Sequence, residues 1–278
     1  IGLVDDLVSF ANSKSKRFYC WVHGDHEIDY KNPDSVFFKF FSFNSRRLKN
    51  EIILPANMYT DISKENSDSN IIYRNKKEIP SIGFDGVASY SLSKIIPVIA
   101  MNTISKVGNK FFGYRYLQES IFPPMIKRKK ILSKIDNSKK LNTNFNYRDQ
   151  FSIGIVGKNN TARQQYIDSI VNNDYTLCYR GAGNYSMRLF EVLCLGRIPL
   201  FINTDCVLPF ENEIDWRDIL IWIEEKDVDN INDIVLEYHN SLSNKEFIER
   251  QAYCREIWLK YCSTKGQYKQ IVSLLRNN

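Results

Sequence analysis

The sequence has little of what metal and disulfide chemistry require. Six cysteines and three histidines are spread over 278 residues, and no two cysteines form a C-x-x-C pair. This spacing argues against a zinc or disulfide framework, and the apolar neighbours of most cysteines predict small buried side chains. A Walker-type phosphate loop and a G-x-S-x-G nucleophile elbow are also absent, so neither of these two chemistries is indicated.

Long apolar runs are missing as well. No segment approaches the roughly 18 residues of a membrane span, and the opening IGLVDDLVSF is too short and too acidic for a signal peptide. We therefore expect a soluble chain without a transmembrane segment. The net charge of +6 suits anionic partners such as nucleotide diphosphates, nucleic acid or a membrane surface, without ranking them. The abundance of Lys, Asn and Ile is typical of a virus or a low-GC bacterium.

Two α/β units are predicted, with a boundary near residues 75–80. Residues 1–79 contain three short β-rich runs: FYCWVHG, SVFFKFFSF and NEIILPA. Residues 80–278 alternate strands with helices, beginning at the strand IPSIGFDG, which predicts a parallel, doubly wound sheet. Ligands of such sheets bind beyond the carboxyl ends of the strands, where we place the turns at Gly157, Gly181 and Asn203.

The end of the chain predicts a long helix with one apolar face. Its core residues recur at helical spacing: Phe247, Gln251, Cys254, Trp258 and Tyr261. Residues 264–275 could then cross back to the first unit.

Residues 179–210, YRGAGNYSMRLFEVLCLGRIPLFINTDCVLPF, are the most informative part of the sequence. A turn containing Gly181 and Gly183 leads into a predicted helix that begins at Asn184 or Ser186. The unpaired backbone N–H groups of such a helix start point at whatever lies above them, and they favour an anion. The turn and Ser186 are therefore candidate ligand contacts.

A cation and a carboxylate share one face of this helix. Arg188 falls in its first turn, and Glu191 follows three residues later. The pair suits a phosphate and a ribose hydroxyl. The helix ends at Gly196, and residues 198–202 follow as an apolar strand, as expected in an α/β layer.

Three stretches in this region, GNYSMRLFEVL, GRIPLFI and LPFENEIDW, resemble a known family. The exostosin family of inverting glycosyltransferases, glycosyltransferase family 47, carries a G-x-x-S-x-R-x-x-E-A-like helix, a G-x-I-P-V strand and an L-P-F…W turn in the same order. Val192 departs mildly from the pattern, since Ala is commoner there. The resemblance extends upstream over about two thirds of the chain, and residues 1–79 match faintly.

The resemblance implies a GT-B-like α/β fold with two Rossmann-like domains facing a cleft. Residues 1–79 form the small acceptor-side domain and residues 80–278 the donor domain. The implied reaction is inverting transfer of xylose, glucuronate or galactose from a UDP-sugar to a glycan hydroxyl, in surface-glycan assembly. The size and composition of the chain are similar to those of a chlorovirus xylosyltransferase. The lack of an anchor favours a cytoplasmic enzyme, in the host cytoplasm if the source is viral.

The donor's diphosphate is expected to meet arginines. Arg163, Arg180 and Arg188 form a predicted cationic rim, because the planar guanidinium meets two phosphate oxygens at once. Such a rim can do the work of a metal, so we expect no metal or other cofactor. The resemblance implies that Glu191 accepts hydrogen bonds from the ribose, with an ion pair to Arg188 as the alternative.

Other predicted donor contacts are open to a second interpretation. Tyr179 and Phe151 either stack on the base or pack in the core. Gly83 and Asp85 are expected to end the first strand of the second unit and to face the donor, but Asp85 suits a cap of the next helix equally well.

The base that removes the acceptor's proton is expected in the cluster HGDHEID. Asp25 is the first candidate, ahead of His23, His26 and Asp29. A hydrophilic turn without chemistry is the alternative. Metal binding by the same residues is disfavoured, because their close spacing in one turn makes a shared coordination shell awkward.

A competing class is a non-catalytic polyanion or nucleic-acid binding protein, supported by the basic stretch at residues 126–140. A solvated surface explains that stretch more simply, and no aromatic residues are interleaved with its lysines. Asp227 and Asp229 form a D-x-D pattern, but their context favours helix capping over metal binding. A third reading is a donor-binding fold that has lost activity.

Overall fold

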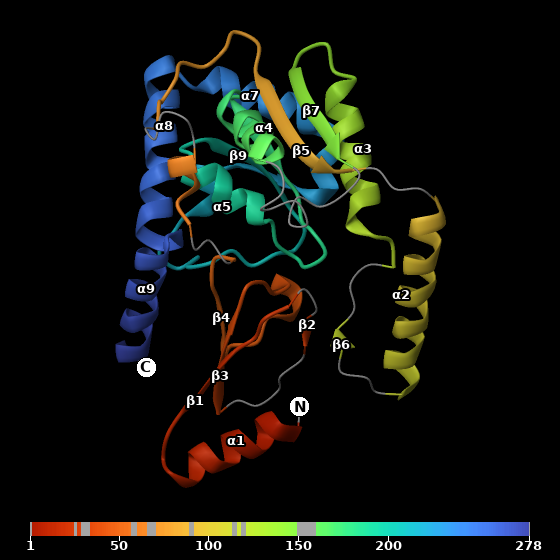
Figure 1. Cartoon of the computed structure of the whole chain (residues 1–278), viewed down its shortest axis with the longest axis vertical. Coiled ribbons are helices and arrows are strands. Elements are labelled where there is room, and N and C mark those ends of the chain that lie inside the picture. The colour runs from red at the N-terminus through yellow and green to blue at the C-terminus, as the bar shows by residue number, and fades with distance from the viewer. Residues whose placement is uncertain are drawn as a thin grey trace.

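A computed structural model describes residues 2–24, 27–28, 34–56, 60–65, 71–88, 92–112, 116–117, 121–148 and 160–277. Its strands form two separate parallel sheets flanked by helices (Figure 1). A two-stranded ribbon also pairs β2 (Glu27–Ile28) with β6 (Tyr116–Leu117) in the antiparallel sense. The predicted α/β class is confirmed.

The smaller sheet is built from the three predicted β-rich runs. Its parallel strands lie in the order β1-β3-β4, and α1 contacts β1. The elements are α1 (Gly2–Ser13), β1 (Phe18–Trp21), β3 (Ser35–Lys39) and β4 (Glu51–Ile53). Lys39 and Glu51 form a buried ion pair at 2.9 Å, and the carboxylate also accepts a hydrogen bond from Ser42 at 2.8 Å. Both charges are thereby compensated inside the sheet.

The larger sheet has five parallel strands in the order β10-β9-β8-β5-β7. They are β5 (Ser81–Val87), β7 (Asn142–Arg148), β8 (Tyr175–Cys178), β9 (Ile198–Asn203) and β10 (Ile221–Glu224). The chain adds β7 on one side of β5 and then β8 on the other, so the winding reverses between β5 and β8. In sheets of this type, ligands bind outside the carboxyl ends of the strands at that reversal.

Helices cover both faces of the larger sheet, and its strand residues Ile82, Phe84, Tyr175 and Leu177 are fully buried. The helices are α2 (Leu92–Phe112), α3 (Pro124–Asp136), α4 (Asn160–Val171), α5 (Met187–Cys194), α6 (Trp216–Ile219), α7 (Ile231–Ser241), α8 (Asn244–Ile257) and α9 (Thr264–Asn277). Among the described residues, short helical turns are η1 (Asn44–Arg46), η2 (Ile62–Glu65), η4 (Glu225–Asn230) and η5 (Trp258–Cys262).

Gly83 corrects one prediction. The sequence placed it at the end of a strand, but β5 continues to Val87, and Gly83 lies in the middle. A Cβ at Gly83 would come 2.2 Å from the carbonyl oxygen of Ser169 and 2.7 Å from Nδ2 of Asn173. Gly83 therefore allows α4 to pack closely on the sheet, and it does not face a ligand.

The basic stretch at residues 126–140 is not simply a solvated surface. Most of it forms α3, where Arg128, Ile131, Leu132 and Ile135 are buried. Their spacing of three and four residues is an apolar stripe that the surrounding lysines obscure in the sequence. The prediction was therefore wrong for one face of this helix.

The predicted apolar helix near the end of the chain is confirmed. α8 continues into the π-helical turn η5, and the five predicted core residues are buried: Phe247, Gln251, Cys254, Trp258 and Tyr261. On α9, Nε2 of Gln267 donates to the carbonyl of Pro55 at 2.9 Å, just after β4. The last helix therefore touches the chain that leaves the smaller sheet (Figure 1).

An ion pair fastens the segment after β4 to the larger sheet's helices. Oδ2 of Asp61 lies 2.6 Å from Nη2 of Arg255 on α8, and Oδ1 accepts hydrogen bonds from Ser63 at 2.7 Å and the Cys194 thiol at 3.3 Å. Burial tends to raise the pKa of Asp61, but these hydrogen bonds and the Arg255 charge lower it to about 2. The turn η2 is thereby held beside α5.

We expect this pair to make stability sensitive to acid. The pKa of Asp61 is depressed below 3.8 in the folded protein, so its contribution is complete above pH 3.8 and is lost as the pH falls towards 2. Arg255→Gln should lower the free energy of unfolding near neutral pH by about 1–2 kcal/mol and flatten its fall in acid. Urea unfolding across pH measures both effects.

The matched control is Lys140→Gln, which breaks an exposed pair with Asp233 and should change little. Equal losses in the two variants would contradict a special role for Asp61.

Candidate functional site

β5 and β8 separate towards their carboxyl ends. The two strands pair at Ile82 with Tyr175 and at Gly83 with Thr176. Both strands continue beyond these residues without further pairing to each other. Carbonyl groups further along lose their ladder partners on that side and need other donors. This separation coincides with the reversal of winding, where a ligand crevice is expected.

Arg188, in the first turn of α5, spans this separation. Nη2 donates to the carbonyl of Asp85 on β5 at 2.6 Å, and Nη1 donates to the carbonyl of Leu177 on β8 at 3.3 Å. The guanidinium lies 4.3 Å from the centre of the Phe84 ring. Its Nε is buried and has no hydrogen-bond partner among the residues that the structure describes. One buried N–H group at the reversal of winding is therefore without an acceptor among the residues that the structure describes.

Arg128 of α3 bridges the same two strands further along. Nη1 donates to the carbonyl of Val87 at 2.9 Å, and Nη2 donates to the carbonyl of Arg180. The guanidinium also lies 6.0 Å from the centre of the Tyr179 ring. Sequence reasoning missed Arg128 because it stands among lysines, but its place in the apolar stripe of α3 was a usable signal.

The start of α5 lies beside Arg188. Ser186 is the N-cap residue, as predicted, but its hydroxyl makes no capping hydrogen bond. Asn184 is fully buried: its Oδ1 accepts from Thr204 at 2.7 Å, whereas Nδ2 has no partner among the described residues. Gly181 has open space where a side chain would project. Amide and backbone donors gathered at a helix start favour an anion.

Glu191 lies one turn further on and contacts α4. Oε1 is 3.4 Å from Nη1 of Arg163, and Oε2 accepts a hydrogen bond from the hydroxyl of Tyr166. Arg163 also pairs with Glu65 at 2.9 Å. Burial, and next the charge of Glu191, raise the pKa of Tyr166 well above its ordinary value, so its hydroxyl stays protonated. Glu191 therefore pairs with the predicted residue Arg163, in place of the alternative partner Arg188.

The chain after β3 packs against the same edge of the larger sheet. The rings of Phe41 and Tyr185 stack with their centres 5.5 Å apart, and Phe43 pairs with Cys206 in an antiparallel bridge. The guanidinium of Arg180 lies 5.5 Å from the centre of the Phe43 ring. The carboxyl edges of the two sheets thus face each other, with the glycine turn before α5 between them (Figure 1).

Three predicted donor contacts have other partners. Tyr179 is 3% exposed and its hydroxyl donates to Glu225 at 2.7 Å, so its ring packs in the core and offers no face for stacking. The buried carboxylate of Asp85 binds the guanidinium of Arg148, with Nη2 at 2.6 Å, and neither caps a helix nor faces a ligand. Gly83 packs under α4. The part of Asp85 that belongs to the candidate site is its backbone carbonyl, which accepts the hydrogen bond from Arg188.

The candidate bases stay predictions. His23 is exposed just beyond β1, with its ring edge-on to Phe40 at 5.2 Å. The other candidates from this cluster and two from the donor side lie outside the described residues: Asp25, His26, Asp29, Phe151 and Gly157.

The cysteines and the D-x-D pattern have structural roles. All six cysteines are free, and all but Cys20 are buried, as predicted. Asp229 forms an ion pair with Lys134 of α3. Within the described ranges, no group of three His, Cys, Asp or Glu side chains is arranged to hold a metal ion.

These features define a class. Two parallel sheets with facing carboxyl edges, and an arginine-bearing helix start at the reversal of winding, make a GT-B-like α/β fold. Residues 124–238, which include Arg188 and Glu191, match the Exostosin GT47 domain. This part of the chain is therefore similar to an exostosin-like glycosyltransferase domain of family 47, as its sequence motifs indicated.

The relatives carry corresponding names. A probable glucuronosyltransferase, GUT1 of Oryza sativa subsp. japonica, is 31% identical over 97 residues, 35% of this chain and 22% of that protein. A probable beta-1,4-xylosyltransferase, IRX10L of Arabidopsis thaliana, is 37% identical over 70 residues, 25% of this chain and 17% of that protein. A solved glycosyltransferase of Rickettsia africae is 12% identical, with a TM-score of 0.43, over 97% of this chain and 73% of that one. The chain matches about a fifth of the length of the curated relatives.

We expect Arg188 to be required for the folded state. Arg188→Gln should leave the buried carbonyls of Asp85 and Leu177 without a donor, at a cost of about 1–3 kcal/mol each. Urea unfolding should therefore show a loss of about 2–4 kcal/mol. Arg163→Gln breaks partly exposed ion pairs and should cost less than about 1 kcal/mol. A loss below 1 kcal/mol in both variants would mean that the strands do not need this bridge.

Proposed function

We propose that the protein is an inverting glycosyltransferase that moves a sugar from a UDP-sugar to a hydroxyl of a glycan acceptor. The observation that carries the proposal is a pair of buried donors at the start of α5, Nε of Arg188 and Nδ2 of Asn184. Neither has an acceptor among the described residues. Arg188 lies where the sheet's winding reverses, which is where α/β sheets bind nucleotides, and Asn184 lies in the turn that leads to its helix.

The diphosphate of the donor fits this position. Its negative charge grows as the bond to the sugar breaks, so fixed donors aimed at it lower the barrier. Arg188 supplies a guanidinium held rigidly by two strand carbonyls, and the α5 start supplies backbone N–H groups. Open space at Gly181 leaves room for phosphate oxygens to approach the backbone. We propose that these groups replace a metal ion.

The ribose fits the next turn of α5. Glu191 is half-buried and held by Arg163 and Tyr166, so its carboxylate is oriented before a ligand arrives. A ribose hydroxyl can donate to a carboxylate oxygen, and this charged hydrogen bond is stronger than a neutral one. We propose that Glu191 selects a nucleoside with free hydroxyls.

Transfer is a single displacement in this proposal. The acceptor's hydroxyl oxygen forms a bond to the anomeric carbon while the bond to the diphosphate breaks, which inverts the configuration. The hydroxyl proton passes to a base on the acceptor side. We keep Asp25 as the proposed base and His23 as the second candidate. The acceptor binds over residues 1–79 and the donor over residues 80–278.

The names of the relatives support a choice of donor. They include glucuronosyltransferases and beta-1,4-xylosyltransferases, so UDP-xylose and UDP-glucuronate come first and UDP-galactose third. A viral source and a cytoplasmic location are part of the same proposal. Among the described residues, no helix is both long and apolar enough to cross a bilayer.

Nucleotide binding tests the site directly. UDP at about 1 mM should raise the Tm more than a short duplex DNA does, because a ligand of the folded state alone is stabilising. Glu191→Gln should weaken UDP binding about tenfold through loss of a charged acceptor. Glu213→Gln changes an exposed carboxylate and should have no effect. Stabilisation by DNA but not by UDP would support the polyanion-binding alternative and overturn the proposal.

Turnover tests the reaction. In a panel of UDP-xylose, UDP-glucuronate and UDP-galactose, we expect slow release of UDP from at least one donor, faster with a glycan acceptor. A chelator should leave the rate within about twofold, since arginines carry the charge stabilisation. Binding of UDP without any turnover would identify a donor-binding fold that has lost activity, and loss of turnover with chelator would refute the metal-independent mechanism.

A further inference from the structure

Thr204, in the turn after β9, holds the side chain of Asn184. Its hydroxyl donates to Oδ1 of Asn184 at 2.7 Å, and both residues are buried. The amide oxygen is thereby paired, whereas Nδ2 has no acceptor among the residues that the structure describes. A buried donor without a partner is costly, so an acceptor that reached this position would be bound favourably.

The hydroxyl of Thr204 decides what Asn184 can offer to a ligand. An amide side chain has an accepting oxygen and a donating nitrogen. With the oxygen paired to Thr204, the nitrogen is the group left to donate. Without that hydroxyl, Oδ1 would be buried and unpaired, and turning the amide to pair it would withdraw Nδ2. Thr204 therefore favours the orientation in which Asn184 binds an acceptor.

Asp205 fixes the turn that carries Thr204. Its φ of 61° lies in the left-handed region, which Asp tolerates better than most residues. The carboxylate is held by η1 of the smaller unit: the backbone N–H of Ser45 donates to Oδ1 at 3.2 Å, and the Ser45 hydroxyl donates to Oδ2. The backbone carbonyl of Asp205 also accepts a hydrogen bond from the N–H of Asn44 at 2.8 Å. The left-handed turn is thus stabilised from outside the larger sheet.

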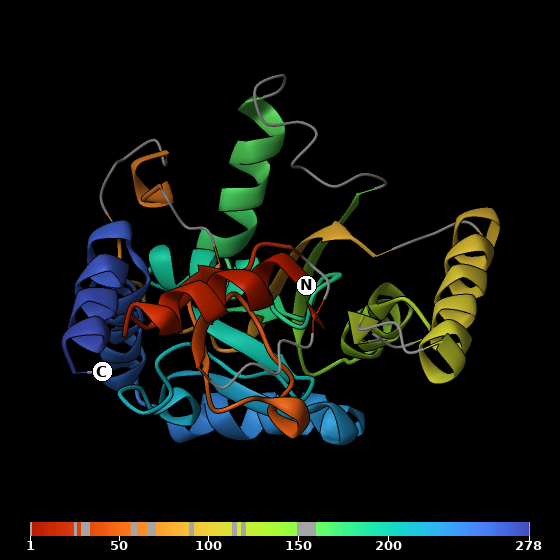
Figure 2. The same ribbon diagram turned by 90° about the horizontal axis from the view of Figure 1, so that it is seen from below.

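The backbone on both sides of these residues is joined in the same way. Phe43 pairs with Cys206 in the antiparallel bridge, and the N–H of Val207 donates to the carbonyl of Ser42 at 3.1 Å. The smaller sheet lies below the larger one in Figure 1 and in front of it in the view from below (Figure 2). The smaller unit therefore reaches Asn184 through the turn after β9.

We propose that Thr204 and Asp205 are positioning residues for the donor's diphosphate, and that the smaller unit takes part in donor binding through them. This inference rests on the proposed function. Thr204 orients Asn184 so that Nδ2 donates to a phosphate oxygen, and Asp205 keeps Thr204 in place through its bonds to Ser45. A phosphate oxygen carries charge, so the hydrogen bond it accepts is stronger than a neutral one. Contact between the two units then raises the affinity for the donor.

A comparison of UDP with uridine distinguishes positioning from a role in stability alone. Partial unfolding lowers the apparent affinity for every ligand of the folded state by the same factor. A change at the phosphate contact affects UDP and leaves uridine, which has no phosphate, unchanged. The ratio of the two dissociation constants therefore reports on the site and not on the fold.

Titration of the intact chain with UDP and with uridine, followed by NMR, tests the proposal. Thr204→Val keeps the shape of the side chain but removes the hydroxyl, so it should weaken UDP binding about fivefold and leave uridine binding unchanged. Asn184→Ala should weaken UDP binding about tenfold. The double variant should bind UDP no more weakly than Asn184→Ala alone, because Thr204 acts through Asn184.

Two further variants test the link to the smaller unit. Asp205→Gly permits the φ of 61° but removes the carboxylate, and it should weaken UDP binding about threefold. Ser45→Ala removes one of the donors to that carboxylate and should weaken UDP binding about twofold. Neither change should affect uridine.

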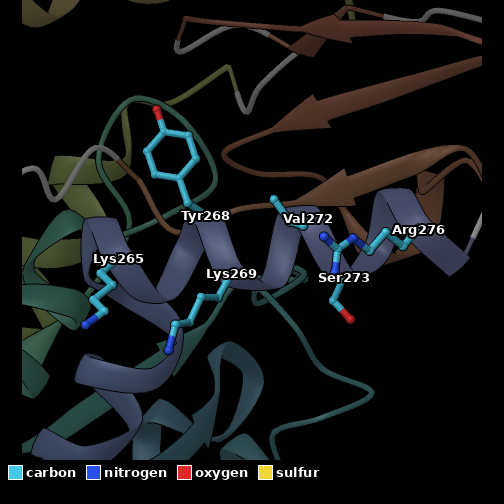
Figure 3. Close-up of a pocket in the computed structure, with 6 residues that line it drawn as sticks. All are labelled: Lys265, Tyr268, Lys269, Val272, Ser273 and Arg276. Carbon is cyan, nitrogen blue, oxygen red and sulfur yellow. The ribbon is translucent and has the colours of Figure 1, made fainter.

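Two controls match these variants. Thr176→Val on β8 removes a hydroxyl that is also buried but has no partner among the described residues. Ser273→Ala on α9 removes an exposed hydroxyl, as Ser45→Ala does, and Figure 3 shows Ser273 in a hollow lined by residues of that helix alone. Both controls should bind UDP and uridine like the parent.

The outcomes separate this inference from the proposed function. A parent chain that does not bind UDP would refute both. If UDP binds and Asn184→Ala weakens it, but Thr204→Val binds like the parent, this inference alone is wrong. An equal loss for UDP and uridine in Thr204→Val, or a double variant weaker than Asn184→Ala, would also overturn it. If Thr204→Val does not fold, Asp205→Gly and Ser45→Ala decide: an unchanged ratio in both contradicts the proposal.

Discussion

The separation of β5 from β8 is the constraint on which the site depends. Beyond Gly83 and Thr176 the two strands no longer pair, and an arginine takes over the hydrogen bonding. Arg188 can do this because its planar fork reaches two carbonyls at once, and because Gly86 leaves room: a Cβ there would come 2.8 Å from Nη2 of Arg188. The same contact fixes the direction of α5 and places the N-terminal end of its dipole at the reversal of winding. A structural requirement of the sheet thus places positive charge where we propose that the diphosphate binds.

The smaller sheet packs against the larger one beside this site. Phe41 and Phe43 follow β3 and pack against Tyr185 and Arg180, so the turn before α5 is held from both sides. At the same edge of the smaller sheet, just after β4, Pro55 accepts a hydrogen bond from Gln267 of α9, which ties this sheet to the last helices. Together these contacts restrict how far the two sheets can separate.

Basic residues of one helix serve two different purposes. Arg128 of α3 points inward and bridges Val87 to Arg180, where a delocalised and weakly hydrated guanidinium tolerates burial. Lys129 and Lys130, the next two residues, point to solvent, where a compact and strongly hydrated ammonium is stable. A rotation of about 100° per residue is enough to separate a role in the fold from a role at the surface.

The sequence by itself determined the features that depend on neighbouring residues, such as turns, helix ends and the apolar face of a helix. The glycine turn, the N-cap at Ser186, the end of α5 at Gly196 and the apolar face of α8 all follow from backbone preferences and periodicity, and the structure has each of them. The tertiary structure alone decided the partners of charged and aromatic side chains. Tyr179 enters the core against Glu225, Asp85 binds Arg148 from β7, and Gly83 lies under α4, because strand order and helix packing bring distant residues together. Pairing across the sheet depends on contacts far apart in sequence, and no local pattern specifies them.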